Sequence, residues 1–427
     1  MAINAKRTIS FSPPDMTDLE INEVAETLKS GWITTGPRTK RLEKELAEYM
    51  GLPVDAPNCV CLNSATASEE LSLRILGIRE GDEVIVPAYT YTSSAAAAIH
   101  AGAKVIFVDS QPDSLEMDYD KMADLINEHT KAVIPVDLGG VPCDYDRIYE
   151  IVESKKALFK PLDDDSSELA KLSSSIQKSL GRVAVMADCA HALGARRVMN
   201  GKNIMCGAIA DFSSFSFHAV KNFTTAEGGA ATWKSIEGVS DADIYHWFQL
   251  LSLHGQSKDA LAKTKLGAWE YDVVAPLYKC NMTDIMAAIG LKQLERYQGL
   301  LARRAEIIKK YDAICDELGV DHIVHFTDEY TSCGHLYITR ITGCNDEQRR
   351  QIITRMAEEG VATNVHYKPL PMMTAYKAYG WDIKDFPNAY KHFENEITLP
   401  LHTLLSDDDV QYICDIFKNL VKDVRGY

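Results

Sequence analysis

Lys221 ends an aromatic and serine-rich run in the stretch "FSSFSFHAVKNFTTAEGGA" (212–230), and two glycines follow it at 228–229. A lysine amine that follows a buried strand can bond covalently to an aldehyde, as in enzymes that use pyridoxal phosphate. The glycine pair would let the backbone pass close to such a cofactor. This chemistry also needs groups that hold the phosphate, the ring face and the ring nitrogen.

Two motifs could hold the phosphate and the ring face. In "LNSATASEEL", Ala65 and Thr66 lie between a short strand and a helix, where backbone N–H groups and the Thr66 hydroxyl can bind an anion. Taken alone, this motif is more typical of an ordinary helix cap. Tyr89 and Tyr91 in "PAYTYTSS" could stack on a planar ring, although aromatic residues at such places more often pack in the core.

A carboxylate could hold the ring nitrogen. Asp188 ends an otherwise apolar strand in "MADCAHALGA", and His191 follows three positions later. A protonated pyridine nitrogen would be a suitable partner, whereas the alternative is an N-cap for the next turn. Lys221 comes 33 residues after Asp188 (221 − 188), about one strand further along the chain. Together the four motifs predict a pyridoxal phosphate site with Lys221 as the covalent anchor.

Several segments, in order, resemble one enzyme family over nearly the whole chain: "GWITTGPRTKRLEKELAEYMG", "NSATA", "GDEVIVPAYTYTSS", "IPVDLGG", "DCAHALGA", "FSFHAVKNFTTAEGG", "NMTDIMAAIGLKQLERY" and "TNVHYKPL". The chain resembles the DegT/DnrJ/StrS family of pyridoxal-phosphate-dependent sugar aminotransferases of fold type I. The resemblance implies an α/β fold, with a mostly parallel seven-stranded sheet flanked by helices and a smaller α+β C-terminal domain.

The resemblance also assigns roles to individual residues. It implies that Lys221 forms the Schiff base and Asp188 pairs with the pyridine nitrogen. The other implied cofactor contacts are Tyr91 on the ring, with Ala65, Thr66 and Ser216 on the phosphate. Asn281 of the "N-x-T-D" motif would reach the phosphate of a neighbouring subunit, which implies a homodimer with shared active sites. Residues expected to line the substrate pocket are Trp32, Thr34, Gly36, His366 and Tyr367.

The implied activity is a transaminase that moves an amino group, with L-glutamate as donor, to a 4-keto or 4-keto-6-deoxy nucleotide sugar for cell-surface polysaccharide or glycan biosynthesis. The motifs are most similar to the branch that includes the UDP-4-amino-4-deoxy-L-arabinose aminotransferase. One departure concerns the sugar pocket, because Pro371 stands where family members commonly have a histidine after "HYxPL". His191 is a candidate cofactor contact near the ring face, and His218 could flank Lys221, but for each a packed histidine is about as compatible with the sequence as a catalytic one.

Three alternatives stay open or are disfavoured. Sugar dehydratases of the same scaffold carry a histidine at the lysine position, so Lys221 disfavours them. A keto-cyclitol could replace the nucleotide sugar as acceptor. A non-catalytic regulatory protein that binds pyridoxal phosphate would keep the same fold.

The elements that must position these residues can be predicted from the pattern. Between 59 and 217, short apolar runs such as "EVIVPAY" and "VAVMAD" alternate with helices, expected at 68–76 and 93–101, which is typical of a parallel α/β sheet. The acidic, serine-rich stretch 153–181 is predicted to be a surface insertion. We expect a large domain over 1–265 and a smaller one over 266–427, with a strand at 360–367 and a final helix from Ser406.

Composition limits the partners. The 427 residues include 45 basic and 61 acidic side chains, a formal charge of −16, which argues against nucleic acid or an anionic membrane as partner. No run approaches the roughly 20 apolar residues that span a bilayer, and no signal-like segment opens the chain. The ten cysteines form no C-x-x-C pair and suggest no metal site. We therefore expect free thiols in a soluble, cytoplasmic protein.

Overall fold

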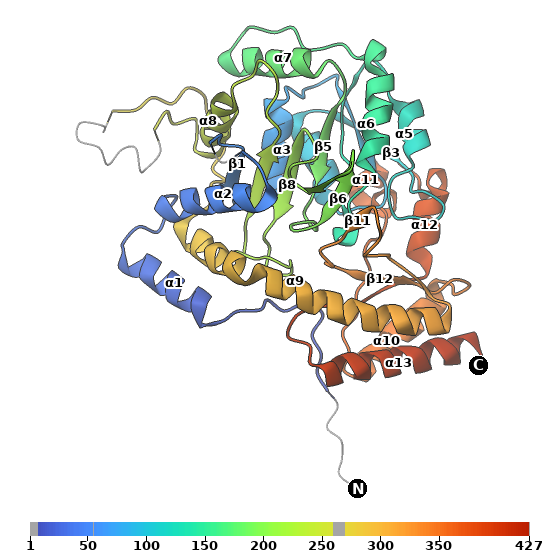
Figure 1. The fold of residues 1–427 in the computed structure, drawn as a ribbon. Coiled ribbons are helices and arrows are strands. Elements are labelled where there is room, and N and C mark those ends of the chain that lie inside the picture. Colours follow the sequence, from blue (N-terminus) through green and yellow to red (C-terminus); the bar gives the residue numbers. More distant parts are fainter. Residues whose placement is uncertain (1–6, 54, 259–269, 427) are drawn as a thin grey trace.

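The computed structural model describes residues 7–53, 55–258 and 270–426. Its centre is a seven-stranded sheet in the order β1-β9-β8-β5-β4-β2-β3 (Figure 1). Only β9 runs antiparallel to its neighbours, which confirms the mostly parallel sheet. The strands are β1 (Cys59–Leu62), β2 (Glu83–Pro87), β3 (Lys104–Val108), β4 (Thr130–Val133), β5 (Ala184–Asp188), β8 (Phe212–Ser216) and β9 (Gly229–Trp233).

Helices cover both faces of this sheet, as the alternation of runs predicted. Side chains of β5 show why both faces are apolar: Val185 and Ala187 enter one buried cluster, while Ala184 and Met186 enter the other. The helices are α2 (Pro37–Met50), α3 (Ala65–Ile75), α4 (Thr92–Ala101), α5 (Tyr119–Leu125), α6 (Tyr145–Ser154), α7 (Glu168–Leu180) and α8 (Asp241–Ser252). The helices predicted at 68–76 and 93–101 are therefore confirmed as α3 and α4.

A second core lies in the C-terminal part of the chain. It packs a small antiparallel sheet of β10 (Asp321–His322), β12 (Tyr337–Arg340) and β13 (Glu396–Leu399) against helices α10 (Asp346–Glu358) and α13 (Asp407–Arg425). The predicted final helix is α13, with Ser406 as its N-cap. The stretch predicted as a strand at 360–367 forms only isolated bridges at Val361 and Asn364, so that prediction was wrong.

Helix α9 (Asp284–Leu318) belongs to both cores. Leu291 and Tyr297 from its first half pack with the large sheet, whereas Ile307 and Tyr311 from its second half pack in the C-terminal core. Figure 1 shows α9 running from the side of α1 (Asp18–Lys29) to the side of α13. The domain boundary predicted between residues 265 and 266 lies outside the described residues.

The stretch 153–181 contains α7, which is docked onto the end of α3. Ser173 Oγ donates to the Ile75 carbonyl at 2.8 Å, and Gln177 Nε2 donates to the Leu76 carbonyl at 2.6 Å. The remaining elements are a sheet of β6 (Arg196–Met199), β7 (Lys202–Met205) and β11 (Tyr330–Thr331), with short helices α11 (Thr374–Ala378) and α12 (Pro387–Glu394). All ten cysteines are free, as predicted. Over the described ranges, none of the helices has the length and apolar character of a membrane span.

Candidate active site

A cavity of about 510 Å³ opens at the carboxyl ends of the central strands. Ligands of open α/β sheets bind at this edge. The cavity brings together predicted residues from distant parts of the chain: Ala65, Thr66, Tyr91, Asp188, His191, Ser216, Lys221, His366 and Tyr367. His218 also lines it and lies 3.5 Å, Nε2 to Oε1, from Glu227.

One end of the cavity is the N-terminus of α3. Ser64 is the N-cap, and its Oγ accepts the Ala67 N–H at 3.1 Å. The first helical N–H groups, those of Ala65 and Thr66, have no acceptor within the helix and favour an anion. Gly229 lets β9 pass against this turn, because a Cβ there would lie 2.5 Å from the Ala65 nitrogen. This end of the cavity therefore has the form of a phosphate cradle, with Ser216 beside it.

Asp188 ends β5 and is buried, with acceptor capacity to spare. Ser94 Oγ donates to its Oδ2 at 2.7 Å, and the Ala190 N–H donates to its Oδ1 at 3.0 Å. Its backbone is fixed by pairing with the Pro135 carbonyl. A carboxylate accepts about four hydrogen bonds, so Asp188 can hold a further donor from the cavity.

Lys221 is half-buried in a turn closed by its own N–H, which donates to the His218 carbonyl at 2.9 Å. Burial lowers the pKa of the Lys221 ammonium to about 8, and the charges of Asp188 and Cys333 oppose part of this shift. A lysine with such a pKa supplies neutral amine near physiological pH. That is the state required of a nucleophile or a general base.

His191 and Tyr367 form a hydrogen-bonded pair whose direction can be assigned. The Gly139 N–H donates to His191 Nδ1 at 3.2 Å, so Nε2 carries the proton and donates to Tyr367 Oη at 3.1 Å. Burial and the charge of Lys221 hold the pKa of His191 well below its usual value. His191 is thus a neutral, packed side chain that also lines the cavity.

The segment 364–367 brings the C-terminal core to the cavity. Glu396 Oε2 accepts the His366 N–H at 2.9 Å, and Thr398 Oγ1 lies 2.9 Å from His366 Nδ1. Burial raises the pKa of Glu396 to about 8, so this carboxyl is protonated at neutral pH. Tyr91 reaches the same region from the other side, with its ring centroid 5.8 Å from that of Tyr367.

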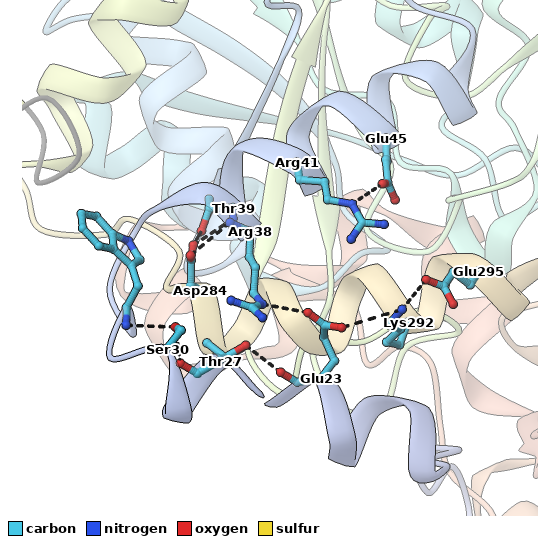
Figure 2. A network of polar contacts seen from close by, with 11 residues as sticks. Glu23, Thr27, Ser30, Arg38, Thr39, Arg41, Glu45, Asp284, Lys292 and Glu295 are labelled. Atoms are coloured by element: carbon cyan, nitrogen blue, oxygen red, sulfur yellow. Dashed lines mark hydrogen bonds and ion pairs between the residues drawn. The ribbon is translucent and has the colours of Figure 1, made fainter. Parts of the chain in front are cut away.

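Four predicted residues lie elsewhere and do not line this chain's cavity: Trp32, Thr34, Gly36 and Asn281. Asp284, at the start of α9, holds the segment that contains the first three of these residues: its Oδ1 accepts the Gly36 N–H at 2.8 Å. Its carboxylate also accepts the N–H groups of Arg38 at 3.0 Å and Thr39 at 2.9 Å (Figure 2). Asn281 Nδ2 donates to Thr35 Oγ1 beside it at 2.5 Å. Their roles stay predictions.

Several cavity residues were not predicted. Ser93 and Asn364 belong to this group. Two buried residues that contact Asp188 from outside the cavity were not predicted either: Ser94 on α4 and Glu69 on α3. Glu69 was detectable, because it lies four residues from Ala65 and from Leu73, which are both buried, and so shares their helix face. An acid at such a position has either a buried partner or a proton.

The groups in the cavity fit the phosphate, the ring nitrogen and the aldehyde of pyridoxal phosphate. It offers an anion cradle, an acceptor for a ring nitrogen and a lysine with available amine. A model of the DegT/DnrJ/EryC1/StrS aminotransferase family matches residues 14–160 and 167–418. The chain belongs to this family. The match leaves only 161–166 of the predicted insertion uncovered.

Related proteins agree with this assignment. The chain is 34% identical over 424 residues to the spore coat polysaccharide biosynthesis protein SpsC of Bacillus subtilis, covering 97% of both chains. It is 32% identical to a UDP-4-amino-4-deoxy-L-arabinose–oxoglutarate aminotransferase of Shewanella sediminis, over 96% of this chain and 97% of that one. The putative sugar aminotransferase Spr1654 of Streptococcus pneumoniae, solved in its PMP form, is 53% identical with a TM-score of 0.90, over 98% of this chain and 100% of that one.

The family membership establishes the cofactor and the class of reaction. DegT/DnrJ/EryC1/StrS aminotransferases depend on pyridoxal phosphate, and Spr1654 has been solved in both PLP and PMP forms. This chain is accordingly a pyridoxal-phosphate-dependent aminotransferase of sugars, with the fold type I architecture predicted from its sequence.

Proposed function

We propose that this enzyme transfers an amino group from L-glutamate to the keto group of a nucleotide-linked sugar. The main observation in its support is that one cavity brings Lys221 together with Asp188 and the N-terminus of α3. Burial there lowers the pKa of Lys221 to about 8. When bound, the cofactor supplies an aldehyde that takes up the amino group and a ring that withdraws electrons.

The chain's own residues then have separate tasks. Ala65, Thr66 and Ser216 bind the phosphate, and Asp188 accepts the hydrogen bond of the ring nitrogen. Lys221 Nζ anchors the cofactor and, when free, moves the proton at the carbon that gains or loses the amino group. Tyr91 covers the ring face, and its 57% exposure leaves it accessible from the cavity mouth. His366 and Tyr367 contact the sugar.

A second subunit would complete the site in this proposal. Asn281 reaches the neighbour's phosphate. Trp32 and Thr34 belong to the neighbouring segment, where Asp284 hydrogen-bonds the backbone of Thr34 and Gly36. Their position outside their own cavity supports this arrangement. Measuring the mass in solution, and mixing an inactive Lys221 variant with an inactive Asn281 variant, tests it through recovery of activity in mixed dimers.

The role of Lys221 is tested by Lys221→Ala. We expect the visible absorbance of the bound cofactor and all measurable turnover to be lost, because no other amine lines the cavity among the described residues. Lys234→Ala is the matched control: Lys234 is also partly buried, but its Nζ donates to the Ile209 carbonyl at 3.2 Å, outside the cavity. Turnover in the Lys221→Ala variant would refute the assignment.

The acceptor is tested with a panel of UDP-, dTDP- and GDP-linked 4-keto sugars beside free keto-cyclitols, with glutamate as donor. We expect amination of a nucleotide sugar only. The name of the arabinose aminotransferase supports a UDP-linked sugar, and that of SpsC supports polysaccharide biosynthesis. Amination of the cyclitol alone would favour the alternative acceptor. Cofactor binding without amino transfer to any of them would favour a regulatory role.

A further inference from the structure

Glu69 is a fully buried acid beside Asp188. It lies on the apolar face of α3 with no exposed surface. Ser214 Oγ donates to its Oε1 at 3.2 Å, and its other oxygen, Oε2, receives no hydrogen bond from the described part of the chain. Ser214 is the register partner of Asp188 across β8 and β5, so its bond to Glu69 places the Glu69 carboxyl beside the Asp188 carboxyl, and the two interact. Two carboxylates have no proton to share, so this contact needs one of the pair to be protonated.

The hydrogen bonds decide which carboxyl carries the proton. Asp188 accepts two donors, Ser94 Oγ and the Ala190 N–H, and its charge acts favourably on the nearby Lys221 ammonium. Within the described ranges, Glu69 accepts a hydrogen bond from Ser214 Oγ alone. Donors stabilise the charged form of a carboxyl, so the negative charge belongs on Asp188 and the proton on Glu69.

We propose that Glu69 is a positioning residue that stays protonated and donates a hydrogen bond to Asp188, which keeps Asp188 singly charged and oriented toward the ring nitrogen of the cofactor. This inference rests on the role of Asp188 proposed above. A donor on the far side of the carboxylate makes Asp188 a weaker base, so the shared proton remains on the ring nitrogen.

The surroundings of Glu69 support its neutral form. Burial and then the charge of Asp188 raise the pKa of Glu69 well above its usual value. β9 contributes no titratable side chain, and β1 contributes only Cys59 and Cys61. Most charged or titratable groups on the helices packed against α3 have partners of their own: His100 with Glu70, Lys171 with Glu168, Lys178 with Asp163, Asp241 with Trp233 and Tyr245 with Glu43. The other two, Asp243 and His246 of α8, are exposed to solvent.

Protonation of Glu69 can be tested on the full chain without cofactor. The infrared spectrum of wild type should contain a carboxylic-acid C=O band at neutral pH that Glu69→Gln lacks. Glu70→Gln is the matched control, because the neighbouring Glu70 pairs with Arg74 at 2.9 Å and should lose carboxylate signal instead. Loss of a carboxylate band in Glu69→Gln would overturn the proposal.

Unfolding gives a second measurement of the same proton. Because the pKa of Glu69 is raised in the folded state, the protonated carboxyl contributes its full stability below the ordinary pKa of Glu, 4.5. That contribution is lost as the pH rises from 4.5 to the folded-state pKa. The ratio of the wild-type to the Glu69→Gln unfolding constant should therefore rise about tenfold per pH unit above that value, up to the folded-state pKa. A ratio that does not change with pH contradicts a neutral Glu69.

The effect on Asp188 is tested on the holoenzyme with nitrogen NMR of an isotope-labelled cofactor ring. Glu69→Leu removes the donor, so the ring-nitrogen signal should move toward that of neutral pyridine, and the half-reaction with glutamate should slow about tenfold to a hundredfold. Glu69→Gln, whose amide can donate to Asp188, should restore the signal and most of the rate. An unchanged ring-nitrogen signal in Glu69→Leu refutes the positioning role. A chain that binds no cofactor refutes the proposed function instead and leaves the infrared result intact.

Discussion

Asp188 and Asp211 are both buried aspartates of the central sheet, but they lie at opposite edges. Asp211 precedes β8 and forms two hydrogen bonds with Arg182, Nη1 to Oδ2 at 2.7 Å and Nη2 to Oδ1 at 2.9 Å, and Oδ2 also accepts the Val185 N–H. Asp188 ends β5, has no such bidentate cation and faces the cavity. An aspartate thus forms a structural ion pair at the amino ends of the parallel strands, whereas another aspartate faces the cavity at their carboxyl ends.

The difference shows how to separate a structural carboxylate from a functional one. The hydrogen-bonding capacity of Asp211 is met within the fold, so its charge stabilises the chain. Asp188 can accept a further hydrogen bond from a ligand. It also lies beside a second buried acid, Glu69, which would lower the stability of a purely structural site. Burial by itself does not distinguish the two.

Among the variants that test this difference, Asp188→Asn should have the largest effect, and that effect should be on turnover. We expect turnover to fall about a hundredfold to a thousandfold, because a neutral amide no longer stabilises charge on the ring nitrogen. The melting temperature should stay close to wild type. Steady-state kinetics and thermal unfolding of one preparation measure both, and near-normal turnover would contradict the role of Asp188.

Asp211→Asn should show the opposite pattern. Removing one partner of a buried ion pair leaves Arg182 with Glu153 and the Val183 carbonyl, so we expect the free energy of unfolding to fall by about 3 kcal/mol. Turnover per folded molecule, measured well below the melting temperature, should change little. A loss of turnover as large as that of Asp188→Asn would remove the distinction between the two edges.

A smaller effect that also separates the two aspartates is the pH dependence of cofactor capture by Lys221. Only the neutral amine captures the aldehyde of the cofactor, and the pKa of about 8 means that the capture rate rises about tenfold per pH unit below pH 8 and levels off above it. The charge of Asp188 raises the pKa of Lys221, so Asp188→Asn should move the midpoint to lower pH. Asp211→Asn should leave it in place. Stopped-flow absorbance after mixing apoprotein with cofactor measures the midpoint in each variant.

Much of the fold was predictable because buried parallel strands are short apolar runs that alternate with helices. Runs such as "VAVMAD" became β5, and Ser406 capped the last helix as expected. The stretch 360–367 was misread, because its apolar residues serve single bridges and the cavity wall. The bridge partners of this stretch, Ile9 and Thr398, are distant in the sequence, so local periodicity does not reveal them.

The candidate site was predictable where a residue follows a strand. Asp188, Ser216 and Lys221 were found by that rule together with the family resemblance. Ser94 and Glu69 escaped it, since both lie within helices and act on Asp188 through the fold. The predicted roles of Trp32 and Asn281 could not be tested in this way, because neither residue lines the cavity of its own chain.

Helix α9 has a mechanical consequence. Its 35 residues form one unbroken rod about 50 Å long that is embedded in both cores. Swinging one core away from the other would require bending that rod and unpacking side chains along it. Entry and exit of a bulky sugar are therefore not expected to require a hinge motion between the two cores.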